Sequence, residues 1–296
     1  MSRLSPTAQG ILLMLGAIFL FSMMDATAKM LMARYEPMQV VWARYAGMML
    51  VVSVLLAPRI GPLLRTRRLG LQLLRSAFLF AATFSFFTAI SRMDIAAATA
   101  VMQVHPVLLT LGAALLLREP LGPRRIAAIA AAIAGALIVI RPGSDIFTLT
   151  ALLPLLGGVF YASYALTTRF LGRDEPILTS FLYTAIIGTV VASALAVPVW
   201  TTPSLPEAAI FLALGAVGAA GQFLLIRSLT VAEAGAVAPF GYAGVVFATL
   251  WGLLAFGEVP DLWTLFGALV IIGAGVYVWH RETRLRAAAV VARRAE

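Results

Sequence analysis

Long apolar runs separated by short polar connectors dominate the chain. Ten runs approach or reach the roughly 17–25 apolar residues that a helix needs to cross a hydrocarbon core of about 30 Å. They cover residues 10–31, 38–57, 73–90, 95–117, 126–140, 149–168, 177–199, 208–226, 234–256 and 262–279. The runs are continuously apolar, whereas the strands of a membrane barrel would alternate. The pattern therefore predicts an all-α integral membrane protein with ten transmembrane helices.

The connectors between these runs are rich in arginine, proline and glycine, as in REPLGPRR (118–125) and GRDEP (172–176). If the N-terminus is cytoplasmic, seventeen arginines fall on the cytoplasmic side, Arg75 among them. The outer side then has Arg34, Arg92 and Arg141. Because basic residues favour the cytoplasmic ends of transmembrane helices, both termini are expected in the cytoplasm.

Composition excludes several kinds of site. The 296 residues are 61% hydrophobic and 12% charged, with a net charge of +9, no cysteine, two histidines and one lysine. Disulfides, thiolate metal sites and a phosphate-binding loop with its lysine are therefore excluded. We expect no cofactor and no nucleic-acid partner, because the basic residues are explained by the connectors. The expected partners are a small-molecule substrate and the lipid bilayer, and a homodimer is left open.

The second half of the chain resembles the first. The segment GAIFLFSMMDATAKML (16–31) corresponds to GGVFYASYALTTRFL (157–171), and HPVLLTLGAALLLREP (105–120) corresponds to GVVFATLWGLLAFGEV (244–259). This indicates a first five-helix repeat at 1–141, a second at 142–281 and a basic cytoplasmic tail at 282–296. Because five is odd, the second repeat is inverted, and inverted repeats place a transporter's substrate site near the midplane between them.

Several segments carry a family resemblance. They are MDATAK (24–29), VVWARY (40–45), FGEVPDLW (256–263) and the glycine-rich stretches AIAAAIAGALIVIRPG (128–143) and LFGALVIIGAGVYV (265–278). Together they resemble the EamA-like branch of the drug/metabolite transporter superfamily over nearly the whole chain. The resemblance implies a bacterial inner-membrane carrier of small polar metabolites, often amino acids moved outward. Aromatic amino-acid exporters and S-adenosylmethionine carriers are both similar.

Three charged residues lie inside the first two spans. Asp25 and Lys29 are four residues apart, with the acid first, so they can neutralise each other on one helix face. Arg44 reaches a similar depth in the second span. Two interpretations stay open: a pocket for the carboxylate or amine of a zwitterionic substrate, or an interhelical ion-pair network with Lys29 reaching outward.

The remaining candidates are one histidine, its neighbour and aromatic residues. His105 precedes Pro106, which loosens the fourth span; it either binds substrate or a proton, or hydrogen-bonds a neighbouring helix. Mid-span aromatics either pack between helices or face the substrate. Glu119 and Glu258 lie at equivalent helix ends, where we expect them to cap helices or pair with loop arginines. The expected substrate-binding residues are Asp25, Lys29, Trp42, Arg44, Gln103, His105, Tyr161, Tyr164, Tyr183 and Tyr242.

These features predict a secondary transporter that exports or exchanges small polar metabolites by alternating access. Amino acids, aromatic or otherwise neutral, are the first substrate class. S-adenosylmethionine, or another organic cation or nucleotide-like metabolite, is the alternative. A membrane channel is the alternative of another class. An enzyme is not expected, because the chain lacks clustered acids, histidines or cysteines.

Overall fold

The computed structural model describes residues 5–57, 60–117, 123–142, 148–171, 175–232 and 234–295, and Glu119 lies outside these ranges. The described residues form helices and connecting turns without a strand. The first half consists of α1 (Pro6–Leu31), α2 (Pro37–Leu56), α3 (Ile60–Leu63), α4 (Leu69–Ile90), α5 (Ile95–Met102), α6 (His105–Leu117) and α7 (Pro123–Ile140). The second consists of η2 (Leu149–Leu152), α8 (Leu153–Leu171), α9 (Ile177–Ala196), η3 (Val197–Val199), α10 (Leu205–Val231), α11 (Ala234–Val237), η4 (Ala238–Tyr242), α12 (Ala243–Trp251), η5 (Gly252–Phe256) and α13 (Leu262–Ala295).

The predicted spans are present. Within the described residues, nine helical segments are long and apolar enough to cross a membrane, and the shorter apolar segment Ile126–Ile140 corresponds to the fifth predicted span. Proline marks several starts: Pro6, Pro37 and Pro123 open α1, α2 and α7. Proline suits the first helical turn because the N–H it lacks would have no partner there.

Two spans are interrupted near their middle. The fourth divides into α5 and α6 at residues 103–104, immediately before His105 and Pro106. The ninth changes from α11 through the 3₁₀ turn η4, which contains Pro239, to α12. Proline removes a backbone donor, so a continuous α-helix is not favoured at either point. Gln103 Nε2 donates to the Gly241 carbonyl oxygen at 3.1 Å, so the two interruptions meet.

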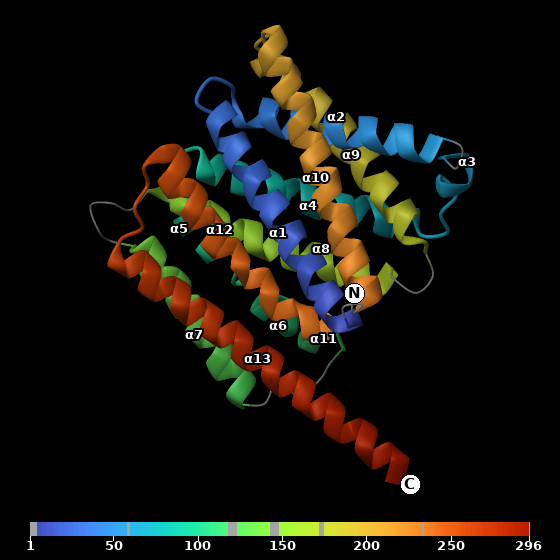
Figure 1. Cartoon of the computed structure of the whole chain (residues 1–296), viewed down its shortest axis with the longest axis vertical. Helices are drawn as coiled ribbons and strands as arrows, with labels where there is room; N and C mark the ends of the chain where they lie inside the picture. Colours follow the sequence, from blue (N-terminus) through green and yellow to red (C-terminus); the bar gives the residue numbers. More distant parts are fainter. Residues whose placement is uncertain are drawn as a thin grey trace.

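The two halves interlock rather than lie side by side. Helix α1 packs against α10, and in the equivalent arrangement α8 packs against α4. Helices α2 and α9 pair with each other, as do α7 and α13, which run together along one side of the bundle in Figure 1. Exchanged partners of this kind are the contacts expected of two inverted five-helix repeats.

The helices α2 and α10 cross at two glycines. A Cβ atom added to Gly47 would lie 2.8 Å from the Gly215 Cα, closer than side-chain carbons normally approach a backbone. Small residues permit such close helix contacts in membranes.

Helix α13 is the longest helix of the described residues. It continues well beyond the bundle to Ala295, as Figure 1 shows.

Candidate functional site

An internal cavity of about 190 Å³ lies between α1, α2, α4, α5 and α8 and beside the two interruptions. Its aromatic wall includes Phe21, Phe86 and Phe87. Its polar lining includes Asp25, Arg44, Thr99, Gln103, His105, Tyr161, Tyr164 and Gln222. Six of the expected binding residues are therefore brought together: Asp25, Arg44, Gln103, His105, Tyr161 and Tyr164. The wall of this cavity has one carboxylate, that of Asp25, and one guanidinium, that of Arg44.

The two charged side chains of this cavity differ in how they are held. Arg44 Nη1 donates to Thr83 Oγ1 at 2.5 Å, and its guanidinium lies 5.8 Å from the centroid of the Phe87 ring. Asp25 lines the same cavity as Arg44 but has no hydrogen bond or ion pair with the residues that the structure describes. The Asp25 carboxylate is consequently available to a bound cationic group.

The histidine and tyrosines form one side of the cavity. The His105 Nδ1–H donates to the Met102 carbonyl oxygen at 3.0 Å, which leaves Nε2 as the acceptor of the neutral ring. The imidazole meets the Tyr161 ring edge to face, with 4.7 Å between centroids, and Tyr161 in turn lies 5.5 Å from Tyr164. Such a wall offers aromatic ring faces and edges against which an apolar or planar group can pack.

Lys29 does not pair with Asp25, so that prediction is wrong. Its ammonium group pairs with Glu258 and donates to the Met93 carbonyl oxygen at 2.7 Å. Glu258 also accepts a hydrogen bond from the Ile95 N–H at 3.0 Å, at the start of α5, which confirms its predicted capping role. Glu258 and Met93 together provide the ammonium group with one charged and one neutral acceptor.

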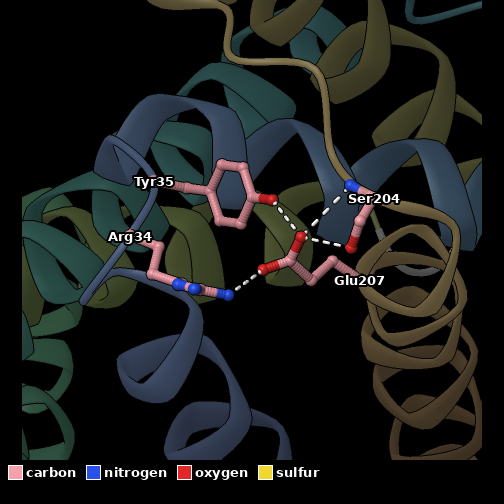
Figure 2. A network of polar contacts seen from close by, with 4 residues as sticks. All are labelled: Arg34, Tyr35, Ser204 and Glu207. Carbon is pink, nitrogen blue, oxygen red and sulfur yellow. Dashed lines mark hydrogen bonds and ion pairs between the residues drawn. The ribbon is translucent and has the colours of Figure 1, made fainter.

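A second polar cluster lies at the same end of the bundle, shown in Figure 2. Glu207, in the first turn of α10, accepts hydrogen bonds from Arg34 at 2.6 Å, Tyr35 at 2.8 Å and the Ser204 hydroxyl at 2.5 Å. We call this region, residues 29–36, 91–95, 200–207 and 257–261, the Glu258 end. Its contacts join α1 of the first half to α10 and the end of η5 in the second.

Charges at the Glu258 end also influence a neighbouring carboxyl group. Partial burial and the Glu258 carboxylate raise the pKa of Asp94, while the Lys29 ammonium lowers it. Asp94 immediately precedes α5. The Asp94 and Glu258 carboxyl groups therefore lie near each other, and the positive charge of Lys29 offsets the repulsion between them.

A second cavity, of about 370 Å³, adjoins the first and extends toward the opposite end of the bundle. Both are lined by Arg44, Leu79, Tyr161, Tyr164 and Gln222. Its far wall contains Ile177 at the start of α9 and Thr230 near the end of α10. We call this opposite region, residues 64–68, 175–177 and 229–232, the Glu175 end.

Arg75 lines the second cavity together with Arg44, and sequence reasoning assigned it to a cytoplasmic connector. It lies inside α4, its side chain is only 5% exposed, and it forms hydrogen bonds to α8 and α9. Thr99 and Gln222 were also missed, because single polar residues in apolar runs gave no distinct signal. Arg75 could have been found from its place inside the apolar run at 73–90.

Four expected residues lie outside the linings of both cavities. Lys29 belongs to the Glu258 end. Trp42 lies beside that end, because its ring packs on Trp200 and its Nε1 donates to Ser193 at 2.9 Å. The Tyr183 hydroxyl donates to the Leu64 carbonyl oxygen at 2.8 Å, near the Glu175 end. Tyr242 packs against Gly275 of α13, where an added Cβ would overlap the Tyr242 hydroxyl.

Comparison with known proteins gives a family and a set of relatives. The model of the EamA-like transporter family matches the chain twice, over residues 8–141 and 148–279. A riboflavin transporter of Vibrio cholerae is 28% identical over 281 residues, which cover 93% of this chain and 94% of the relative. An S-adenosylmethionine uptake transporter of Rickettsia bellii is 26% identical over 271 residues, covering 90% and 93%.

Two further matches extend the comparison. A pseudopaline exporter of Pseudomonas aeruginosa is 30% identical over 268 residues, covering 90% of this chain and 94% of the exporter. A solved crystal structure shares the fold, with a TM-score of 0.63 at 20% identity over 94% of this chain and 99% of its own. The chain is therefore a multi-pass membrane transporter of small metabolites rather than an enzyme, and it belongs to the EamA-like transporter family.

Proposed function

We propose that this protein is a secondary carrier of zwitterionic metabolites, with amino acids as the first substrate class. The observation that supports this most is that Asp25 and Arg44, one acidic and one basic side chain, line the same cavity. An α-ammonium group can approach the unpartnered Asp25 carboxylate, and an α-carboxylate can approach the Arg44 guanidinium. A ligand with both charges leaves neither residue uncompensated in a low-dielectric interior.

The aromatic wall favours ligands that also have an apolar or planar portion. Phe21, Phe86 and Tyr161 face the same cavity as the two charges. S-adenosylmethionine is the second candidate, because it combines an α-amino acid group with a planar base and because relatives are named as its uptake transporters. Both candidates share the α-amino acid group that the two charges would bind.

Alternating access is the proposed mechanism. The Glu258 end is joined by the Lys29–Glu258 pair and the Glu207 cluster, whereas the second cavity extends from the central one toward the Glu175 end. A carrier needs a central site that communicates with one side at a time. We propose that rocking of two repeats, divided near residue 142, breaks these contacts and transfers access to the Glu258 end.

The arginine bias supports an orientation in the bacterial inner membrane with both termini cytoplasmic. The Glu175 end would then face the cytoplasm. The cysteine-free chain permits a direct test with Thr202→Cys and Arg65→Cys, two exposed positions at opposite ends. An impermeant maleimide added to whole cells should label Thr202→Cys alone. Labelling of Arg65→Cys alone would reverse the orientation.

A binding test addresses the substrate class. The purified protein is heated with L-phenylalanine, with phenethylamine, which lacks the carboxylate, and with 3-phenylpropionate, which lacks the ammonium group. S-adenosylmethionine and the remaining amino acids complete the panel. We expect zwitterions to raise the melting temperature more than either singly charged analogue. Equal effects of the analogues and the amino acids would contradict recognition of both charges.

A further inference from the structure

The guanidinium of Arg75 has neutral neighbours. Its Nε donates to Thr168 Oγ1 at 2.7 Å, and its Nη1 donates to the Ser180 carbonyl oxygen at 3.0 Å and to Thr184 Oγ1 at 2.7 Å. Its Nη2 donates to the Tyr164 hydroxyl at 2.7 Å, and the guanidinium lies 4.5 Å from the centroid of that ring. Among the residues that the structure describes, no carboxylate pairs with it.

Counting the hydrogen-bond donors of Arg75 and Tyr164 shows that this cluster lacks acceptors. Arginine has five N–H donors, and the four bonds to Thr168, Ser180, Thr184 and Tyr164 leave one donor on Nη2. The Tyr164 hydroxyl accepts from Nη2, so its own proton is also free of any hydrogen bond to the described residues. Two adjacent donors, on atoms 2.7 Å apart, thus have no acceptor.

Two donors at this spacing match the two oxygens of a carboxylate. Arg75 and Tyr164 both line the second cavity, whose lining has a second guanidinium, Arg44, and no acidic residue. A buried positive charge without a counterion is costly inside a membrane protein, and such residues commonly face a substrate pathway. The negative charge that the described structure lacks can be supplied by a ligand.

We propose that Arg75 and Tyr164 form a second carboxylate-binding subsite, between the central cavity and the Glu175 end. The inference rests on the proposed function for the identity of the carboxylate, which is that of the substrate. In transit the carboxylate exchanges Arg44 for Arg75, and Tyr164, which lines both cavities, stays beside it throughout. The subsite would therefore select for substrates with a carboxylate independently of Asp25.

The competing explanation is that Arg75 only fastens α4 to α8 and α9. Its bonds to Thr168 and Thr184 would serve that purpose without any ligand. The two explanations differ in one respect: if Arg75 is purely structural, any preference for an anion over its neutral isostere comes from Arg44 and survives the replacement of Arg75. Benzoate and benzamide provide that comparison, because they have the same shape and differ in charge.

The experiment measures the melting temperature of the purified full-length protein against benzoate and against benzamide. We expect benzoate to stabilise the wild-type protein more than benzamide does. The Tyr164→Phe variant keeps the ring but loses the hydroxyl, and it should bind benzoate about tenfold more weakly. Arg75→Gln should lose the preference altogether, while Arg67→Gln, the same change at an exposed arginine near the same end, should retain it.

Three outcomes would overturn the subsite. They are an equal response of the wild-type protein to benzoate and benzamide, an undiminished preference in Tyr164→Phe, and a preference that Arg44→Gln abolishes but Arg75→Gln retains. If Arg75→Gln does not fold, Tyr164→Phe in the Arg44→Gln background decides the question, because a benzoate preference that remains without Arg44 and is lost with the Tyr164 hydroxyl belongs to the subsite. Because benzoate carries no ammonium group, the result is independent of whether Asp25 binds an amino acid. If amino acids stabilise the protein no more than their singly charged analogues do, but the preference for benzoate over benzamide is retained, the proposed function is contradicted and the subsite is not.

Discussion

The Lys29 ammonium group pairs with the Glu258 carboxylate, and this contact joins the end of α1 to the segment that follows η5. The same carboxylate accepts the Ile95 N–H, and the same lysine donates to the Met93 carbonyl oxygen. Three segments from both halves are thus held at one point. The side chains of Lys29 and Glu258 are only 13% and 16% exposed, so solvent screens the pair weakly.

Breaking this pair should open the Glu258 end. A Thr99→Cys variant places a reactive thiol in the central cavity of the otherwise cysteine-free protein. Adding Glu258→Gln leaves the Lys29 charge without its counterion, so an impermeant maleimide should react several-fold faster from the Glu258 end. Glu36→Gln, the same change at an exposed residue of that end, is the control. Unchanged labelling in Glu258→Gln would show that the pair does not close this end.

The central cavity should lose affinity when either charge is removed. Asp25→Asn and Arg44→Gln should each weaken binding of the most stabilising amino acid at least about tenfold, because a hydrogen bond to a charged group contributes about 1.5–3 kcal/mol. Asp25→Asn should not destabilise the empty protein, since this carboxylate has no partner among the described residues. Thr27→Ala is the control, because that hydroxyl bonds only to the Met23 carbonyl oxygen of its own helix. Wild-type affinity in Asp25→Asn would remove Asp25 from the site.

The contact between the two interruptions should contribute to stability. Replacing Gln103 by leucine leaves the Gly241 carbonyl oxygen without this donor, so we expect a loss of about 1–3 kcal/mol in the free energy of unfolding. Gln9→Leu, at an exposed position in the first turns of α1, should have little effect. The free energy of unfolding of each variant is measured by unfolding the protein in sodium dodecyl sulfate and monitoring the helix content by circular dichroism. Equal stability of the two variants would show that the interruptions are not coupled through Gln103.

The close crossing of α2 and α10 predicts a sharp difference between two glycines. Gly47→Ala introduces a methyl group within 2.8 Å of the Gly215 Cα, so the helices must separate, at a cost of roughly 1–3 kcal/mol. Gly273→Ala in α13 has no atom within 4 Å of the new methyl group and should not destabilise the protein. Melting temperatures of the two purified variants check this. A tolerated Gly47→Ala would mean that α2 and α10 pack more loosely.

Features that depend on composition and local sequence were predictable. The apolar runs determine the spans, and Pro106 indicated where the fourth span is interrupted. Contacts between distant segments were not predictable. Lys29 has an acid four residues away, yet it pairs with one that is 229 residues away in sequence, a choice that only helix packing determines. Arg75 was misassigned because an arginine near the end of a span has the same sequence signal as a connector arginine.

In the candidate site, too, the sequence predicted some features, whereas others depend on how the helices pack. The presence of Asp25, Arg44 and His105 inside apolar runs was sufficient to select them, because buried charges and a titratable ring are costly there. Periodicity could not show which aromatic rings face the cavity, since Tyr161 and Tyr242 are both mid-span. The packing of Tyr242 against Gly275 depends on the contact between η4 and α13.

The central claim is that an alternating-access carrier moves a zwitterion past Asp25 and Arg44. Counterflow tests it most directly: proteoliposomes loaded with an excess of the unlabelled amino acid are diluted into a trace of the labelled one. We predict a transient accumulation of label above its external concentration in the wild-type protein and in Thr27→Ala, and none in Asp25→Asn. Equilibration without an overshoot would indicate a channel, and an undiminished overshoot in Asp25→Asn would contradict the proposed site.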